Sequence, residues 1–208
     1  MPATLPLGPA WQGGGTSGVD GEEQPPSPPA PSAGGGLLLG GGNCPDAQAV
    51  LDRTNQYRAW HQAPPLQWSR TLAAASLQYA KQLAARKCEL VHGAYGENLQ
   101  RVGGFPKPDD KCLVAIDAWY DELQYYDFNA KDLYRDNWGK MIGHFTQLVW
   151  RSSTTVGCAM ASANTPVTFP GGSKVMGGCK VIVCRYEPYG NWADGGYFSR
   201  NVWPREDA

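Results

Sequence analysis

Two histidines and two glutamates are the residues of this 208-residue chain whose types and spacing suit chemistry. His144 stands between a glycine and the apolar run of residues 145–150, and His92 lies shortly before Glu97. Glu122 closes a Trp-Tyr-Asp-Glu segment. An imidazole can transfer a proton near neutral pH or bind a metal, and a carboxylate can orient that imidazole or activate water. The pattern predicts one pocket that holds His92, Glu97, Glu122 and His144.

This pocket has two interpretations. In the first, His92 and His144 bind Zn²⁺ and leave open positions for water, although catalytic zinc sites usually have three protein ligands. In the second, both histidines are core residues with hydrogen-bonded rings, and the glutamates are surface residues. The remaining histidine, His61, has no acidic residue near it in sequence, and we interpret it as structural. The sequence contains no Gly-x-Ser-x-Gly segment that would offer another hydrolytic route.

Composition limits the partners and the domain organisation. The formal net charge is −1 and charged residues make up 18% of the chain, which gives no support for nucleic-acid binding. No apolar run approaches the roughly 20 residues of a membrane-spanning helix, so we expect a soluble chain. Residues 1–43 are dominated by Gly, Pro, Ser and Ala and cannot bury enough apolar surface to fold. We expect a disordered segment over residues 1–43 and one domain over residues 44–208, with an irregular aromatic tail.

The six cysteines indicate disulfides. They spread from Cys44 to Cys184 without the C-x-x-C pairs of a zinc ribbon or a thioredoxin-type motif, and spacing alone does not fix which of them pair. Disulfides imply an oxidising compartment, so we expect secretion. The N-terminal residues 1–15 contain no Lys or Arg and show no signal peptide, so the export signal would lie upstream or take another form.

Hydrophobic periodicity predicts three helices before residue 125. The first is expected over residues 45–59, and the second runs to about residue 87 with Ser69 as its N-cap. A third begins at Asp109 or Asp110, either of which is a suitable N-cap, and continues to about Leu123.

The second half of the chain predicts strands. Residues 155–160 and 180–186 are rich in β-branched side chains and predict two strands joined by a long loop over residues 166–178. Residues 102–108 are rich in Gly and Pro and predict a loop. The apolar run of residues 145–150 fits either a buried strand or a helical turn.

Several of these segments resemble the CAP superfamily, which includes cysteine-rich secretory proteins, antigen 5 and plant pathogenesis-related class 1 proteins. Gly-His-Phe-Thr-Gln-Leu-Val-Trp at residues 143–150 resembles its first signature, and Cys-Arg-Tyr-Glu-Pro-Tyr-Gly-Asn at residues 184–191 resembles its second. Further similar segments occur in the family's order at residues 55–58, 63–69, 92–99, 119–122 and 156–159. Two positions depart from the pattern: Ile142 stands where plant members usually have Cys, and Arg185 stands where the second signature usually has Asn.

The resemblance implies an α+β fold, a three-layer α/β/α sandwich with a small antiparallel sheet that disulfides stabilise. It makes residues 143–150 a short helix and implies a cleft that holds His92, Glu97, Glu122 and His144. It also implies the disulfides Cys158–Cys184 and Cys88–Cys179, which leaves Cys44 to pair with Cys112.

The resemblance favours a secreted, non-catalytic protein that binds a sterol, a fatty acid or another small lipid, in defence or extracellular signalling. No cofactor is required, and Zn²⁺ at His92 and His144 is an option. One alternative is a metal-dependent hydrolase with these two ligands and with Glu97 or Glu122 as general base. The other is a precursor whose tail beyond Tyr186 is released as a signalling peptide, as the plant class suggests.

Overall fold

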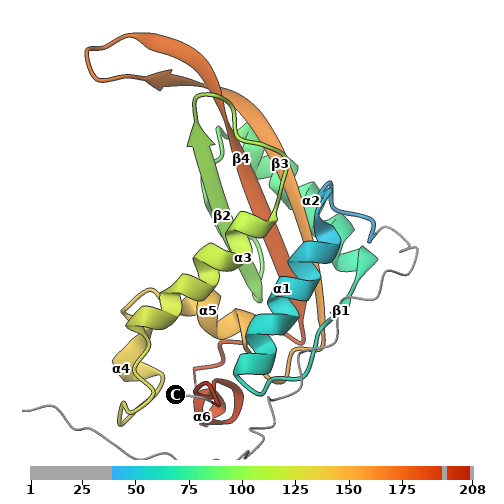
Figure 1. The fold of residues 1–208 in the computed structure, drawn as a ribbon, viewed down its shortest axis with the longest axis vertical. Helices are drawn as coiled ribbons and strands as arrows, with labels where there is room; N and C mark the ends of the chain where they lie inside the picture. The colour runs from blue at the N-terminus through green and yellow to red at the C-terminus, as the bar shows by residue number, and fades with distance from the viewer. Residues whose placement is uncertain (1–38, 194–195, 207–208) are drawn as a thin grey trace, which may run out of the picture. The chain divides into compact units, whose positions relative to one another are not determined.

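The computed structural model describes residues 39–193 and 196–206, so residues 1–38 of the segment expected to be disordered lie outside it. In chain order the elements are α1 (Ala47–Trp60), β1 (Gln67–Trp68), α2 (Arg70–Ala85), β2 (Glu97–Gly104), α3 (Leu113–Tyr120), the 3₁₀ helix η1 (Asp121–Tyr125), α4 (Arg135–Trp138), α5 (Gly143–Leu148), β3 (Thr155–Thr168), β4 (Lys174–Glu187) and α6 (Tyr197–Asn201), as Figure 1 shows. None of the helices within these described ranges is long and apolar enough to cross a membrane.

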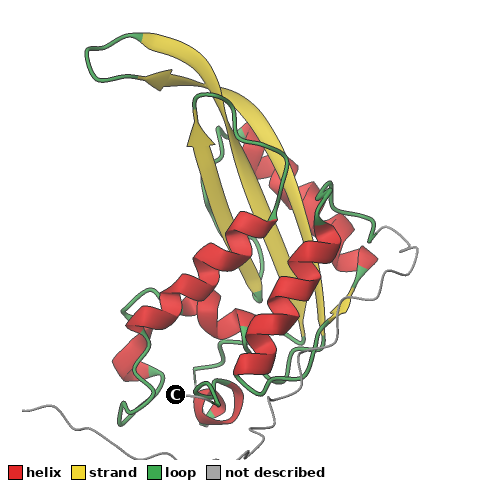
Figure 2. Cartoon of the chain, in the orientation of Figure 1, coloured by secondary structure: helices red, strands yellow, loops and turns green. Residues whose placement is uncertain are grey.

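The four strands form one sheet in the order β1-β3-β4-β2. β4 pairs antiparallel with both β3 and β2, whereas the short β1 runs parallel to β3. In Figure 2, α2 lies against one face of this sheet, and α1 and α3 lie on the other. The predicted three-layer α/β/α sandwich is therefore confirmed.

The side chains of β4 alternate between the two interfaces of the sandwich. Val181 and Val183 join a buried cluster with Leu83 of α2, whereas Ile182 and Tyr186 join the larger cluster with α1, α3 and α5. Successive side chains of a strand point to opposite faces, so the part of β4 that is covered on both sides, residues 181–184, is apolar without interruption. This continuous apolar run explains why β4 was recognisable in the sequence.

The caps of the second and third helices differ in origin. Ser69 accepts a hydrogen bond from Leu72 N at 3.2 Å, which confirms it as the N-cap of α2. The expected cap of α3 at Asp109 or Asp110 is wrong. The carboxylate of Asp46, at the start of α1, accepts hydrogen bonds from the backbone N–H groups of Cys112 and Leu113 at 2.9–3.0 Å. A cap from another helix leaves no local signal in the sequence.

The hairpin and the strand before it also differ from the expectation. β3 and β4 are each 14 residues long, so the loop covers residues 169–173 and not the predicted 166–178. Residues 97–104 form β2, where the sequence predicted a loop from residue 102 onward. The β2 backbone pairs with β4 from Glu97↔Arg185 to Gly104↔Gly178, and this pairing outweighs the weak strand propensity of its glycines.

Three disulfides fasten the layers: two are the pairs that the family resemblance implies, and the third is the pair that those two leave. Cys44–Cys112 joins the starts of α1 and α3, Cys88–Cys179 joins the end of α2 to β4, and Cys158–Cys184 joins β3 to β4. Contacts with the domain begin before Cys44, because Trp68 Nε1 donates to the Gly40 carbonyl and Met160 N donates to the Gly42 carbonyl.

Candidate functional site

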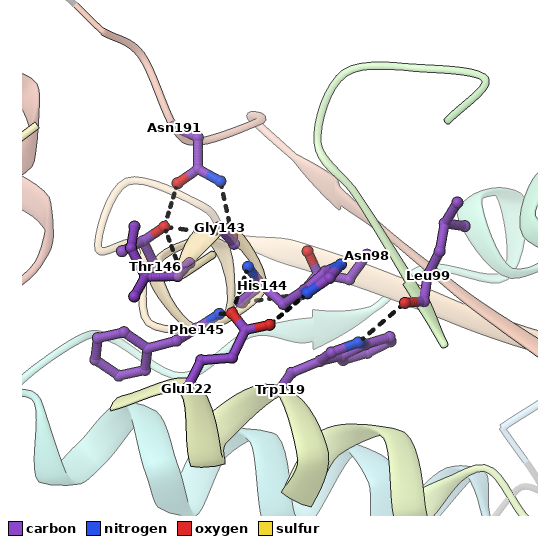
Figure 3. A network of polar contacts seen from close by, with 10 residues as sticks. Asn98, Leu99, Trp119, Glu122, Gly143, His144, Phe145, Thr146 and Asn191 are labelled. Carbon is purple, nitrogen blue, oxygen red and sulfur yellow. Dashed lines mark hydrogen bonds and ion pairs between the residues drawn. The ribbon is translucent and has the colours of Figure 1, made fainter. Parts of the chain in front are cut away.

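His144 and Glu122 form one half of the predicted pocket, shown in Figure 3. Glu122 lies in η1, directly after α3, and His144 lies in the first turn of α5. The Glu122 carboxylate accepts hydrogen bonds from His144 N at 3.0 Å and Phe145 N at 3.1 Å, and it lies 2.6 Å from His144 Nδ1. Because Nδ1 donates to a carboxylate, the lone pair of His144 lies on Nε2.

Three neighbouring segments fix α5 and therefore His144. Asn191 Nδ2 donates to the Gly143 carbonyl at 2.8 Å, and Thr146 Oγ1 donates to Asn191 Oδ1 at 2.7 Å. From β2, Asn98 Nδ2 donates to the His144 carbonyl at 3.0 Å. The Trp119 ring lies nearly parallel to the imidazole, with centroids 5.9 Å apart. The surroundings thus hold the first turn of the helix and one side of the ring (Figure 3).

His92 and Glu97 form the other half. Glu97 opens β2, and its side chain is fully buried, whereas His92 lies in the preceding loop with 59% of its side chain exposed. Glu97 Oε1 accepts a hydrogen bond from Gly93 N at 3.0 Å and lies 3.5 Å from His92 Nδ1. The histidine is therefore held less closely than His144.

Arg185 is a further member of this half that the sequence did not assign to the site. It lies opposite Glu97 in the β2–β4 register, and its Nε and Nη2 atoms donate to Glu97 Oε2 at 3.0 and 2.9 Å. Burial by itself would raise the pKa of Glu97. Hydrogen bonds from His92, the Gly93 N–H and Arg185 outweigh burial and lower the pKa below its ordinary value of 4.5.

The structure brings all four predicted residues together. The rings of His92 and His144 lie with centroids 6.4 Å apart, and neither Nε2 atom has a hydrogen-bond partner among the described residues. Each ring has a carboxylate on its Nδ1 side, an arrangement typical of metal-binding histidines. Within the same residues, no group of three potential donors includes either histidine. The donor set thus fits a two-histidine site whose other ligands are not side chains.

The four residues line a cleft of about 950 Å³ with an aromatic wall. Tyr189 stacks on Tyr95 at 5.6 Å and on Trp192 at 4.7 Å, and Trp138 and Met141 contribute further apolar surface. A turn at Gly96 makes the wall possible. Gly96 has φ +66°, and a Cβ there would lie 2.3 Å from Tyr189 Cβ. The stacking of these aromatic residues cannot be predicted from the sequence, because Tyr95 is far from Tyr189 and Trp192 along the chain.

The remaining histidine lies in the core. His61 is fully buried, with Nδ1 2.6 Å from the Trp203 carbonyl and Nε2 3.1 Å from the Tyr120 hydroxyl. Nδ1 donates to the carbonyl, which can only accept, and the Tyr120 hydroxyl is the partner of Nε2, so both ring nitrogens have a hydrogen-bond partner. This confirms the structural interpretation of His61.

The C-terminal residues, expected to be irregular, include the helix α6. Phe198 and Val202 are buried, and the Trp203 carbonyl is the partner of His61. Within the described part of the segment beyond Tyr186, α6 and the residue after it therefore contribute side chains to the core.

Comparison with known proteins finds relatives of this chain in sequence and in structure. The chain is 40% identical to pathogenesis-related protein 1A of Nicotiana tabacum over 147 residues, which cover 70% of this chain and 76% of the relative. It is 35% identical to pathogenesis-related protein 1 of Arabidopsis thaliana over 149 residues, covering 71% and 79%. The solved structure of BmVAL-1 shares the fold, with a TM-score of 0.56 and 18% identity over 76% of this chain and 81% of that one. The profile of the cysteine-rich secretory protein family matches residues 51–186, and the chain belongs to this CAP family.

Proposed function

We propose that this protein is a secreted, non-catalytic CAP protein that binds a small ligand with an apolar body, such as a sterol or a fatty acid, in the cleft beside His144. Its relatives include the plant pathogenesis-related class 1 proteins, so the biological setting we propose is defence or extracellular signalling.

The cleft is the observation that carries this proposal. Its volume of about 950 Å³ falls within the range of roughly 300–1,000 Å³ that is typical of small-molecule sites. Tyr95 and Trp192 expose 86% and 46% of their surface, so the wall offers apolar area to a ligand. Burying such area stabilises a complex in proportion to the surface removed from water. The free Nε2 atoms of the two histidines supply a polar end for a hydroxyl or carboxylate.

A metal ion is a second potential ligand of the same cleft. His92 and His144 would bind Zn²⁺ through Nε2, with Glu97 and Glu122 holding the rings from behind. A bound Zn²⁺ supplies a Lewis acid that lowers the pKa of bound water.

The two carboxylates are poorly placed to act as general bases. Glu122 already accepts two backbone hydrogen bonds and faces His144 Nδ1, and Glu97 accepts from Arg185 and Gly93. A base must have an oxygen available for the proton it removes. This arrangement favours ligand binding over the metal-dependent hydrolase.

Peptide release from the C-terminus conflicts with the packing of that segment. Cleavage after Tyr186 would remove Phe198 and Val202 from the core and leave His61 without its carbonyl partner. Loss of large buried side chains costs several kcal/mol each, so the remaining domain would be destabilised. We therefore favour an intact domain.

Three disulfides are consistent with an oxidising compartment and with secretion.

The test is equilibrium binding of a radiolabelled sterol and of radiolabelled palmitate to the purified protein. Trp192→Ser removes part of the wall and should weaken binding about tenfold, whereas Tyr125→Ser, which removes an exposed aromatic residue outside the cleft, should not. Equal binding to both variants would contradict the cleft as the site. Hydrolytic turnover of an ester substrate that Glu122→Gln abolishes would favour the hydrolase instead.

A further inference from the structure

The β3–β4 hairpin extends beyond the rest of the sheet. Pairing between β2 and β4 ends at Gly104↔Gly178, whereas pairing between β3 and β4 continues to Thr168↔Lys174. Residues 165–177 therefore form a two-stranded ribbon, which Figure 1 shows reaching past the body of the domain. A two-stranded ribbon gains little stability by itself, so its length calls for a role outside the core.

The ribbon and the adjoining loop expose apolar side chains. Phe169 is 40% exposed, Met176 is 66% exposed, and Phe105, in the loop after β2, is 54% exposed. The rings of Phe105 and Phe169 meet edge to face with centroids 6.2 Å apart. Single exposed apolar residues are normal, but three at one projecting end, two of them in contact, form a small apolar tip.

A basic hollow lies at the base of the ribbon. It has a volume of about 510 Å³ and is lined by Lys87, Arg101 and the backbone of Gly103, Gly104 and Gly178, together with ribbon residues 165–167. The Cys88–Cys179 disulfide places Lys87 beside β4. Neither Lys87 nor Arg101 belongs to an ion pair in the described part of the chain.

The charged side chains of residues 137–186, which include the ribbon, are all basic. Residues 137–186 contain no Asp or Glu, so within the β3–β4 hairpin the acidic residue is Glu187, at the end of β4 far from the tip. The ribbon carries Lys174, and Lys107 lies against Gly178, with its Cγ 2.5 Å from where a Cβ would stand. Anions that approach the tip therefore meet cations that no neighbouring carboxylate on the hairpin neutralises.

From this combination we propose that the ribbon tip and the basic hollow form a peripheral docking surface for a membrane that contains anionic lipid. Aromatic and methionine side chains enter the boundary between head groups and acyl chains, while nearby Lys and Arg side chains attract the lipid phosphates. A soluble polyanion would use the cations and leave Phe105, Phe169 and Met176 in water. The surface shares no residue with the cleft described above, so the inference goes beyond ligand binding there.

The test is sedimentation of the full chain with phosphatidylcholine vesicles that contain or lack phosphatidylserine. We expect binding only to the vesicles with phosphatidylserine. The triple variant Phe105→Ser, Phe169→Ser, Met176→Ser should lose binding by at least about tenfold. Lys87→Gln and Arg101→Gln should each weaken it about fivefold. Lys131→Gln and Tyr125→Ser, which change an exposed cation and an exposed aromatic residue outside the surface, should bind as the wild type does.

Two results would overturn the proposal. One is vesicle binding that the triple variant retains, because the tip would then have no part in it. The other is binding to immobilised heparin with no binding to vesicles, which would assign the cations to a soluble polyanion. Circular dichroism of each variant keeps unfolding separate from loss of docking.

Discussion

The two histidine–glutamate pairs of the cleft differ in what holds each carboxylate. Glu122 binds backbone N–H groups at the start of α5, and its His144 is 31% exposed. Glu97 is buried and binds Arg185 across the β2–β4 ladder, and its His92 is 59% exposed. One pair is an extension of a helix cap and the other is an ion pair inside the sheet. Two sites of the same composition therefore differ in stability, in charge and in how rigidly they hold an imidazole.

Removing the Glu97 carboxylate should have the largest effect on stability. Glu97→Ala leaves the Arg185 guanidinium largely buried without its partner, and breaking such a pair costs about 3 kcal/mol in the free energy of unfolding. Urea denaturation with the disulfides intact measures this loss.

The double variant Glu97→Ala, Arg185→Ala tests whether the lost stability comes from leaving the Arg185 charge unpaired. It should recover some of the loss, because no unpaired charge remains in the sheet. A loss below about 1 kcal/mol in Glu97→Ala alone would show that solvent screens the pair as it does on a surface.

Removing the Glu122 carboxylate should cost less. Glu122→Ala leaves the N–H groups of His144 and Phe145 without their acceptor, and water reaches part of this site, so we expect a loss of about 2 kcal/mol. The same denaturation experiment applies. Asp121→Ala, the preceding exposed residue of η1, is the matched control and should change stability by less than about 0.5 kcal/mol. A cost above that of Glu97→Ala would reverse the order of the two pairs.

The sequence predicts the members of the two histidine–glutamate pairs better than it predicts the tertiary partners that hold them. His92, Glu97, Glu122 and His144 were each recognisable because they stand in motifs, and the apolar periodicity of α2 and β4 was enough to locate those elements. The partnership of Arg185 with Glu97 depends on the strand register, which joins residues 88 positions apart. The Asp46 cap of α3 and the strand β2 likewise arise from tertiary neighbours. Local propensity carries no information about such partners.

The affinity for Zn²⁺ should depend on the tautomer of His144, which its contact with Glu122 determines. In Glu122→Gln, the amide oxygen can still accept from the two backbone N–H groups, which turns the NH₂ group toward His144 Nδ1. The ring proton must then move to Nε2, and that atom can no longer bind a metal. We expect Zn²⁺ affinity to fall about tenfold or more by isothermal titration calorimetry, provided that the proposed two-histidine site binds the ion.

Asp121→Asn removes the same charge one residue earlier without facing a histidine, so it controls for electrostatic attraction. Its affinity for Zn²⁺ should remain within about threefold of the wild type. Equal loss in both variants would mean that charge, and not the tautomer of His144, sets the affinity.

The smallest expected effect is the pH dependence that Glu97 carries. Because the pKa of Glu97 is lowered in the folded protein, the folded state binds this proton less readily than the unfolded chain, whose ordinary value is 4.5. The stabilising contribution is therefore fully present above pH 4.5 and is lost as the pH falls through the folded pKa. Glu97→Gln cannot titrate, so its difference from the wild type in unfolding free energy should be constant above pH 4.5 and should shrink below it. Urea denaturation across this range measures the difference. If it stays constant in acid, the contacts of Glu97 with His92, Gly93 and Arg185 do not favour the ionised carboxylate, and the contrast between the two pairs reduces to their exposure.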